Sequence, residues 1–325
     1  MPKIGILVTT FLRPLSIQTF LKTLYNYVPN DIFSVYVADQ SSMYYNVASI
    51  WNTLNFNAIN TYDIYNTYTS KTYNIYNNIY TSTYSIYTSD KESKINNKDL
   101  YTSDKEDKIS NKDLYKNNKE RCNKLDKSIF FHYFDIGFDK GTSYARNFLT
   151  EVVKEPICLI VDDDFMFDEN TNFEIFLDFL EDYPDFDIVG GQLLKSEPYI
   201  YNLRFEENTL YYSKDLEVFE YKGKKVLVAN IVPQCMFCRT SIFSDYHWDE
   251  IFHVFDHDDF FLNYLSSGKK VAYLDSFICI HNKSRPSSAY NTYRNRAWME
   301  IPKFLNKWNI KEVVGHPYLY KFCKG

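Results

Sequence analysis

The sequence predicts an α/β fold in which a mostly parallel central sheet is covered by helices on both faces. Short continuous apolar runs, typical of strands buried on both faces, alternate with segments whose apolar residues recur at helical spacing. Three of the strand-like runs end directly at an aspartate. The chain has 325 residues, of which 45% are hydrophobic, so it can bury a core of domain size.

The N-terminal part follows a pattern of strand, helix and strand. Residues 4–9 form a continuous apolar run that predicts the first strand. Pro14 suits the first turn of a helix, and apolar residues follow it at helical spacing. Residues 33–38 predict a second buried strand, which ends at Asp39.

The same alternation resumes near residue 131. Strands are expected over residues 131–134 and 157–161, and helices from Ser143 onward and over residues 173–180. In sheets of this kind, ligands bind beyond the carboxyl ends of the strands. Asp39, Asp135 and Asp162 stand at predicted strand ends, so we expect them to share one rim.

Between these two parts lies a segment of different composition. No glycine or proline occurs from Tyr44 to Lys127, and residues 87–100 recur with two changes as residues 101–114. Two polar copies are too few for a solenoid. The sequence therefore predicts one domain over residues 1–325, interrupted by a disordered, low-complexity insertion at about residues 60–123. A partner-binding module is the alternative interpretation of this segment.

Charge and composition exclude several classes of protein. The net charge of −6 argues against a nucleic-acid binder, which usually carries a basic face. No apolar run approaches the roughly 20 residues of a transmembrane segment, and the N-terminal run is interpreted as a strand, not a signal peptide. The six cysteines, including Cys235 and Cys238, are expected to be reduced and buried. The prediction is a cytoplasmic protein, for which peripheral membrane association stays open.

Three consecutive aspartates follow the predicted strand over residues 157–161. Asp162, Asp163 and Asp164 repel one another, and a hard divalent cation would relieve that repulsion and bridge to the phosphates of a nucleotide. Side chains alternate along a strand-like exit, so Asp162 and Asp164 are expected to form the functional pair and Asp163 to support them. The alternative is an exposed acidic loop or a helix start, and spacing alone favours neither.

Several motifs resemble a known enzyme family. The segments DKGTSYARN (139–147), LIVDDDFMF (159–167) and DIVGG (187–191) resemble the catalytic domain of the GT-A fold glycosyltransferases. Within the family-2-like group, the likeness is greatest to the β-1,4-N-acetylgalactosaminyltransferases of the ganglioside GM2 synthase type. Further matching segments are TTFLRP (9–14), VADQS (37–41), NIVPQCMFCRT (230–240) and HDDFF (257–261). The likeness covers almost everything outside the insertion.

The resemblance implies a metal-dependent, inverting glycosyltransferase. It would move a sugar, by resemblance N-acetylgalactosamine or N-acetylglucosamine, from a UDP-sugar donor to a hydroxyl of a glycan, glycolipid or glycoprotein acceptor. Thr10, Arg13 and Asp39 would hold the base and ribose. Arg146 would lie near the nucleotide, where the helix N-terminus also favours phosphate.

The resemblance also implies a metal site and a sugar site. Asp162 would contact ribose or a metal-bound water, and Asp164 would bind Mn²⁺ or Mg²⁺. His281 would complete the site as a nitrogen ligand, although a lone histidine is more often structural. Gly190 and Gly191 would border the sugar, with a plain turn as the alternative.

The segment at residues 257–261 supplies the expected base. An inverting enzyme needs a group that takes the proton of the acceptor hydroxyl. The resembled group carries an acidic residue just before the Phe-Phe pair, so Asp259 is the candidate and Asp258 the reserve. Helix capping is a compatible alternative for both. Residues 283–294 include Lys283, Arg285, Tyr290 and Arg294, which would form a loop over the diphosphate or a solvated tail.

Two other functions fit parts of the pattern. A metal-dependent nucleotidyltransferase also uses carboxylates at strand ends, but it usually has a glycine-rich phosphate loop, and Gly5 stands alone near the N-terminus. A catalytically degenerate domain that binds glycans or partners is the second alternative, and the complete carboxylate set argues against it.

Overall fold

A computed structural model describes residues 4–28, 33–41, 130–282 and 288–323. The predicted insertion at about residues 60–123 lies outside the described residues, as do Lys283 and Arg285. The segments on either side of the insertion are joined in one sheet, because β2 (Phe33–Asp39) pairs in parallel with β3 (Phe130–Asp135). The chain between these two strands therefore connects neighbours in that sheet.

The central sheet has ten strands, in the order β3-β2-β1-β4-β11-β6-β12-β10-β9, with β5 paired to β12. β1 (Ile4–Thr10) lies between β2 and β4 (Ile157–Asp162), and all three are parallel. The strands β3, β2, β1, β4, β6, β12 and β9 run in one direction, while β11, β10 and β5 run in the other. The predicted mostly parallel sheet is confirmed.

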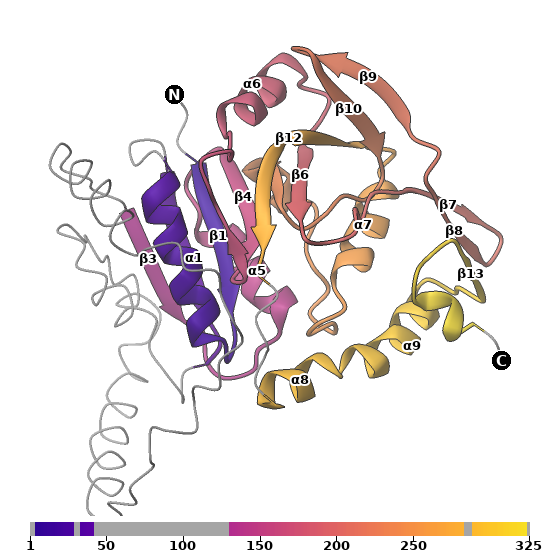
Figure 1. Cartoon of the computed structure of the whole chain (residues 1–325). Helices are drawn as coiled ribbons and strands as arrows, with labels where there is room; N and C mark the ends of the chain where they lie inside the picture. Colours follow the sequence, from indigo (N-terminus) through magenta and orange to yellow (C-terminus); the bar gives the residue numbers. More distant parts are fainter. Residues whose placement is uncertain (1–3, 29–32, 42–129, 283–287, 324–325) are drawn as a thin grey trace, which may run out of the picture. The chain divides into compact units, whose positions relative to one another are not determined.

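The second half of the sheet contains the antiparallel strands. It consists of β5 (Phe165–Met166), β6 (Ile188–Leu194), β9 (Glu217–Tyr221), β10 (Lys224–Ala229), β11 (Met236–Arg239) and β12 (Val271–His281). A small second sheet, β13-β8-β7, is formed by β7 (Asn202–Glu206), β8 (Thr209–Ser213) and β13 (Glu312–Val314). Strand β13, from the C-terminal region, pairs with β8 of the hairpin β7–β8 (Figure 1).

Helices cover both faces of the central sheet, as predicted (Figure 1). One face packs against α1 (Pro14–Tyr27) and α6 (Glu174–Asp182), whose apolar stripes share a core with alternate residues of β1, β2 and β4. The other face packs against α5 (Thr142–Val152), α7 (His257–Leu265) and α9 (Ala297–Lys307). The shorter helices are α8 (Ser288–Arg294) and the 3₁₀ turns η2 (Thr240–Ser244) and η3 (Leu319–Lys321).

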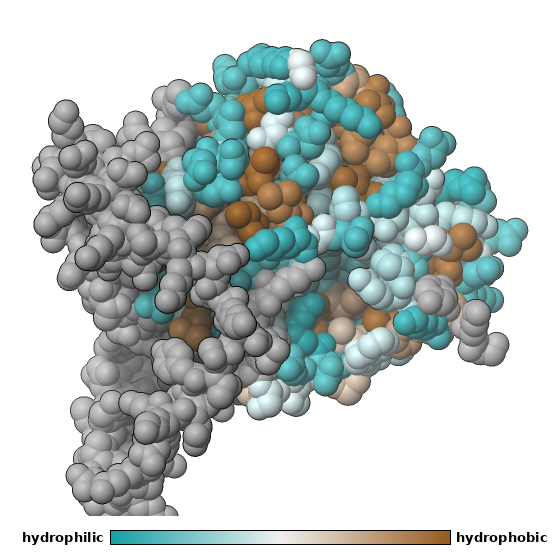
Figure 2. Space-filling model, viewed as in Figure 1, coloured by the Kyte–Doolittle hydropathy of each residue, from teal (hydrophilic) through white to brown (hydrophobic). Residues whose placement is uncertain are grey.

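The surface is mostly polar in the same view, with apolar residues gathered over β9 and β10 (Figure 2). Val218 on β9 is half-exposed there. No residue of β9 or β10 lines the cavity described below. Within the described part of the chain, every helix is too short or too polar to cross a membrane.

Candidate active site

The carboxyl ends of the parallel strands meet at one rim. Thr10 lies opposite Asp39 in the register of β1 and β2, and Thr9 lies opposite Asp162 in that of β1 and β4. Asp39 in turn lies opposite Asp135. The prediction that Asp39, Asp135 and Asp162 share one rim is confirmed.

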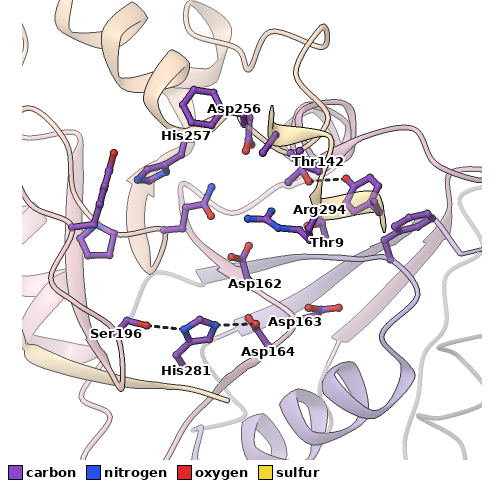
Figure 3. Close-up of a pocket in the computed structure, with 18 of the residues that line it drawn as sticks. Thr9, Thr142, Asp162, Asp163, Asp164, Ser196, Asp256, His257, His281 and Arg294 are labelled. Atoms are coloured by element: carbon purple, nitrogen blue, oxygen red, sulfur yellow. Dashed lines mark hydrogen bonds and ion pairs between the residues drawn. The ribbon is translucent and has the colours of Figure 1, made fainter. Parts of the chain in front are cut away.

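A cavity of about 700 Å³ opens at this rim. Figure 3 shows Asp162, Asp163, Asp164 and His281 on one side and Asp256 and His257 across the cavity. We name the first side, with Thr10, Arg13, Asp162, Asp163, Asp164 and His281, the strand-end wall. The other side, with Tyr199, Asp256, His257, Asp258 and His316, is the α7 wall.

Arg13 neutralises two carboxylates of the strand-end wall. Its Nη1 lies 2.9 Å from Asp163 Oδ1, and Nη2 pairs with Asp164. Asp163 is buried, and its Oδ2 accepts a hydrogen bond of 2.7 Å from Thr10 Oγ1. Burial raises the pKa of Asp163 to about 7, although the charge of Arg13 opposes this shift. Asp163 thus holds Thr10 and Arg13 together, while Asp162 remains a third exposed to the cavity.

Asp164 and His281 form the part of the site that fits a metal ion. His281 Nε2 lies 3.0 Å from Asp164 Oδ2, and its Nδ1 lies 2.6 Å from Ser196 Oγ, which fixes the ring (Figure 3). Asp164 Oδ1 is buried, and no group among the described residues forms a hydrogen bond with it. Burial raises the pKa of Asp164, but the hydrogen bond with His281 and the charge of Arg13 outweigh it, so the net shift is downward.

These atoms suit a divalent cation that takes its remaining ligands from substrate. An orphaned carboxylate oxygen beside an imidazole nitrogen is a mixed donor set that accommodates Mn²⁺, and a protein carboxylate with phosphate and water ligands accommodates Mg²⁺. Among the residues that the structure places, no three acidic, histidine or cysteine side chains already converge on one point. Asp162 instead faces Arg146, so a metal here would depend on diphosphate oxygens and water.

Arg146 connects the two walls. Gly141, with φ +94°, allows the turn into α5, which carries Arg146 on its buried face. The Nη2 of Arg146 lies 3.0 Å from Asp162 Oδ1, and its Nη1 pairs with Asp256 at the start of α7. Arg146 is only 3% exposed, so it acts mainly by holding these carboxylates in place.

Asp258 lies on the α7 wall among neutral hydrogen-bond donors. Its Oδ1 accepts hydrogen bonds from Tyr199 Oη at 2.6 Å and Tyr212 Oη at 2.7 Å. His316 Nδ1 accepts two backbone N–H groups, so its proton sits on Nε2, which lies 2.7 Å from Tyr199 Oη. Burial raises the pKa of Asp258, but the neighbouring His316 and the hydrogen bond from Tyr199 outweigh it, so the net shift is downward. In the described chain no side chain or backbone group bonds to Oδ2.

Asp259, the predicted base, does not line the cavity. Its carboxylate receives hydrogen bonds from Lys307 Nζ at 2.9 Å and from Trp308 Nε1 at 2.8 Å, both at the C-terminal end of α9. The reason is helical geometry: consecutive residues at the start of α7 point about 100° apart, so only one of the pair faces the cavity. Asp258 is that residue.

Three other predicted residues are not among the cavity lining. Asp39 is fully buried, accepting hydrogen bonds from Ser41 N at 2.7 Å and Tyr133 Oη at 3.0 Å. Burial raises the pKa of Asp39 to about 6. Gly190 and Gly191 lie inside β6, where an added Cβ would come within 2.6 Å of Val232 and Phe277, respectively. Their ligand-binding roles stay predictions, and close packing accounts for the glycines.

The α8 helix adds Arg294, for which the sequence allowed either a loop over the diphosphate or a solvated tail. Arg294 lines the cavity, and Figure 3 shows its guanidinium group directed into it. Tyr290 Oη, on the same helix, accepts a hydrogen bond of 3.0 Å from Arg13 Nη1. Arg13 and Arg294 therefore bring positive charge to a cavity that also carries the acidic triplet.

The sequence reasoning missed several residues of the α7 wall. The missed residues are Tyr199 and His316 of the α7 wall and Tyr212, which donates to Asp258. They come from three separate segments, and no pattern singles out two tyrosines among the 30 in the chain. Asp256 was not among the candidate site residues, although its pairing with Arg146 makes it part of the site. The sequence does contain a pattern that points to Asp256, because four consecutive acidic or imidazole side chains occur at residues 256–259.

Comparison with known proteins gives limited similarity. No protein-family model matches the sequence. A stretch of 75 residues is 35% identical to β-1,4 N-acetylgalactosaminyltransferase 2 of Mus musculus, covering 23% of this chain and 14% of the mouse protein. The match spans a small part of both proteins, so it does not establish a family.

Solved structures show a distant likeness. The chain overlaps S. aureus TarS with a TM-score of 0.43 and 14% identity, over 92% of this chain and 39% of TarS. It overlaps the mannosyltransferase PcManGT of Pyrobaculum calidifontis, solved with GDP-Man and Mn²⁺, with a TM-score of 0.45 and 10% identity, over 94% of this chain and 64% of that one. Scores and identities this low establish no shared activity.

Proposed function

We propose that this protein is a metal-dependent, inverting glycosyltransferase that uses a nucleotide-diphosphate sugar. UDP is the favoured nucleotide and an N-acetylhexosamine the favoured sugar, both from the motif resemblance. The observation that carries the proposal is one cavity with three consecutive aspartates and His281 on one side and a separate carboxylate, Asp258, on the α7 wall.

The strand-end wall would bind the donor. Asp164 and His281 would hold Mn²⁺ or Mg²⁺ through the orphaned Oδ1 and the imidazole nitrogen. The bound cation would neutralise charge that develops on the departing diphosphate. Arg294, directed into the same cavity, would contact the diphosphate from the other side. Asp162 has the exposure to reach the ribose.

Asp258 would act as the base in place of Asp259. The acceptor hydroxyl gives its proton to Asp258 Oδ2 as its oxygen bonds to the anomeric carbon. The bond from that carbon to the diphosphate oxygen breaks, and the diphosphate leaves with the electron pair. The lowered pKa of Asp258 keeps it ionised at neutral pH, and two tyrosine hydroxyls on Oδ1 leave Oδ2 for the proton.

The test is turnover of labelled donors without an acceptor. UDP-[³H]N-acetylgalactosamine and UDP-[³H]N-acetylglucosamine are incubated with protein and Mn²⁺, and sugar released to water is counted. We expect slow hydrolysis that EDTA stops. If no UDP-sugar is bound or hydrolysed and Asp164→Ala changes nothing, the proposal fails. Pyrophosphate release from UTP and a sugar 1-phosphate would indicate a nucleotidyltransferase instead.

A further inference from the structure

Two exposed aromatic side chains stand at the mouth of the cavity. Trp298 on α9 is 55% exposed and Tyr318, before η3, is 60% exposed, and both line the cavity. Single exposed aromatic side chains are ordinary, but two that line the same cavity form an apolar surface of the kind that marks a ligand-binding groove. From these two residues we infer a saccharide-binding platform for the acceptor, an inference that rests on the proposed function.

One face of Trp298 is already covered. Its ring stacks on Phe322 with centroids 5.3 Å apart and planes inclined by 29°. The exposed area therefore belongs mainly to the opposite face and the edge. A pyranose ring has a face of C–H bonds that packs flat against an indole ring while its hydroxyls stay hydrated.

The platform is held at a fixed position relative to Asp258. Glu300, two residues after Trp298, is buried, and its carboxylate accepts backbone N–H groups of His253, Val254 and Phe255 at 2.9–3.0 Å. These residues lead directly into α7. On the other side, the backbone N–H of Tyr318 donates to His316 Nδ1 at 3.0 Å, and His316 reaches Asp258 through Tyr199.

The surroundings favour a saccharide over an alkyl chain. His257 Nε2 lies 2.8 Å from the carbonyl oxygen of Val232, so its proton sits there and Nδ1 is an acceptor. Nδ1 is buried and has no hydrogen-bond partner in the part of the chain that the structure describes, and His257 lines the same cavity. A sugar hydroxyl can donate to this nitrogen. Glu197 and Arg294 also line the cavity, and their charges disfavour a lipid tail.

The experiment compares matched variants on an array of immobilised glycans, with UDP and Mn²⁺ present. Trp298→Ala and Tyr318→Ala remove the platform. Met299→Ala and Val314→Ala are controls, because both side chains are exposed and neither lines the cavity. We expect at least a tenfold loss of saccharide binding in the platform variants, a partial loss in Trp298→Phe, and changes within twofold in the controls. UDP affinity and the thermal midpoint should be unchanged throughout.

Two outcomes would overturn the platform: no glycan on the array bound by the wild-type protein, or equal binding by wild type and Trp298→Ala. Failure of the proposed function has a different signature. If the wild-type protein bound a glycan through Trp298 but did not bind UDP with Mn²⁺, the platform would stand and the transferase proposal would not.

Discussion

The strand-end wall and the α7 wall carry their carboxylates in different surroundings. On the strand-end wall, Asp163 and Asp164 share one guanidinium group, that of Arg13, and adjoin a third carboxylate. On the α7 wall, Asp256 is paired with Arg146, whereas Asp258 pairs with no arginine or lysine among the described residues and receives hydrogen bonds from Tyr199 and Tyr212. The first arrangement suits the binding of cations and phosphates, and the second suits a proton acceptor. In this account the strand-end wall neutralises charge on the donor, and the α7 wall accepts the proton.

The largest expected effect comes from the strand-end wall. Asp164→Asn should lower donor turnover about a thousandfold, equivalent to about 4 kcal/mol, because the amide leaves the cation without its charged ligand. Donor hydrolysis in Mn²⁺ measures this loss. Asp185→Asn is the control, since Asp185 is exposed and outside the cavity. Equal losses in the two variants would remove the metal role from Asp164.

The α7 wall offers a direct contrast between neighbouring aspartates. Asp258→Asn should reduce transfer by about 10²–10⁴-fold with UDP affinity unchanged, because the base is lost. Asp259→Asn should leave transfer within about tenfold of wild type. It should instead cost about 1–3 kcal/mol of stability, since Lys307 loses its buried partner. Transfer rates and thermal unfolding of both variants decide which aspartate is the base. The reverse pattern would assign the base role to Asp259.

A smaller effect should appear in the pH dependence of the α7 wall. Tyr199→Phe removes a hydrogen bond that lowers the pKa of Asp258, so that pKa should rise. Because the base must be ionised, the acid limb of the rate profile should move to higher pH. Tyr211→Phe is the matched control, as Tyr211 does not line the cavity. A uniform rate loss without a shift would mean that Tyr199 acts by packing alone.

The last prediction concerns stability at the rim. The folded state holds a proton on Asp39 up to about pH 6, whereas an unfolded aspartate releases it near pH 3.8. Stability should therefore fall as pH rises from about 4 to 6, by up to about 3 kcal/mol. Asp39→Asn should lose this slope in urea unfolding of the ligand-free protein. An unchanged difference between the two proteins across this range would show that Asp39 does not titrate there.

The two walls also differ in how far the sequence could predict them. Asp162 follows an apolar run that can only be a buried strand or a helix segment, and the flanking helical patterns favour the parallel strand. The register of neighbouring strands then places Thr10 and Asp162 at one rim. The spacing of apolar residues that distinguishes strands from helices can be read within a short stretch of sequence. The fold class and the strand-end wall could therefore be predicted.

The α7 wall depends on contacts between distant segments. His316 reaches Asp258 because β13 pairs with β8, which also carries Tyr212. The choice between Asp258 and Asp259 depends on the rotation of α7, which Trp308 and Lys307 on the far side help to fix. Neither the pairing of a three-residue strand nor the rotation of a nine-residue helix is encoded in a local pattern.

The central claim is that the strand-end wall binds a nucleotide diphosphate together with a metal ion. Isothermal titration of UDP into the protein, in Mn²⁺ and again in EDTA, tests it most directly, with Asp164→Asn as the variant. The account predicts one UDP bound per chain in Mn²⁺, with affinity at least about tenfold weaker in EDTA and in the variant. UDP that does not bind, or that binds equally well in all three conditions, would contradict it.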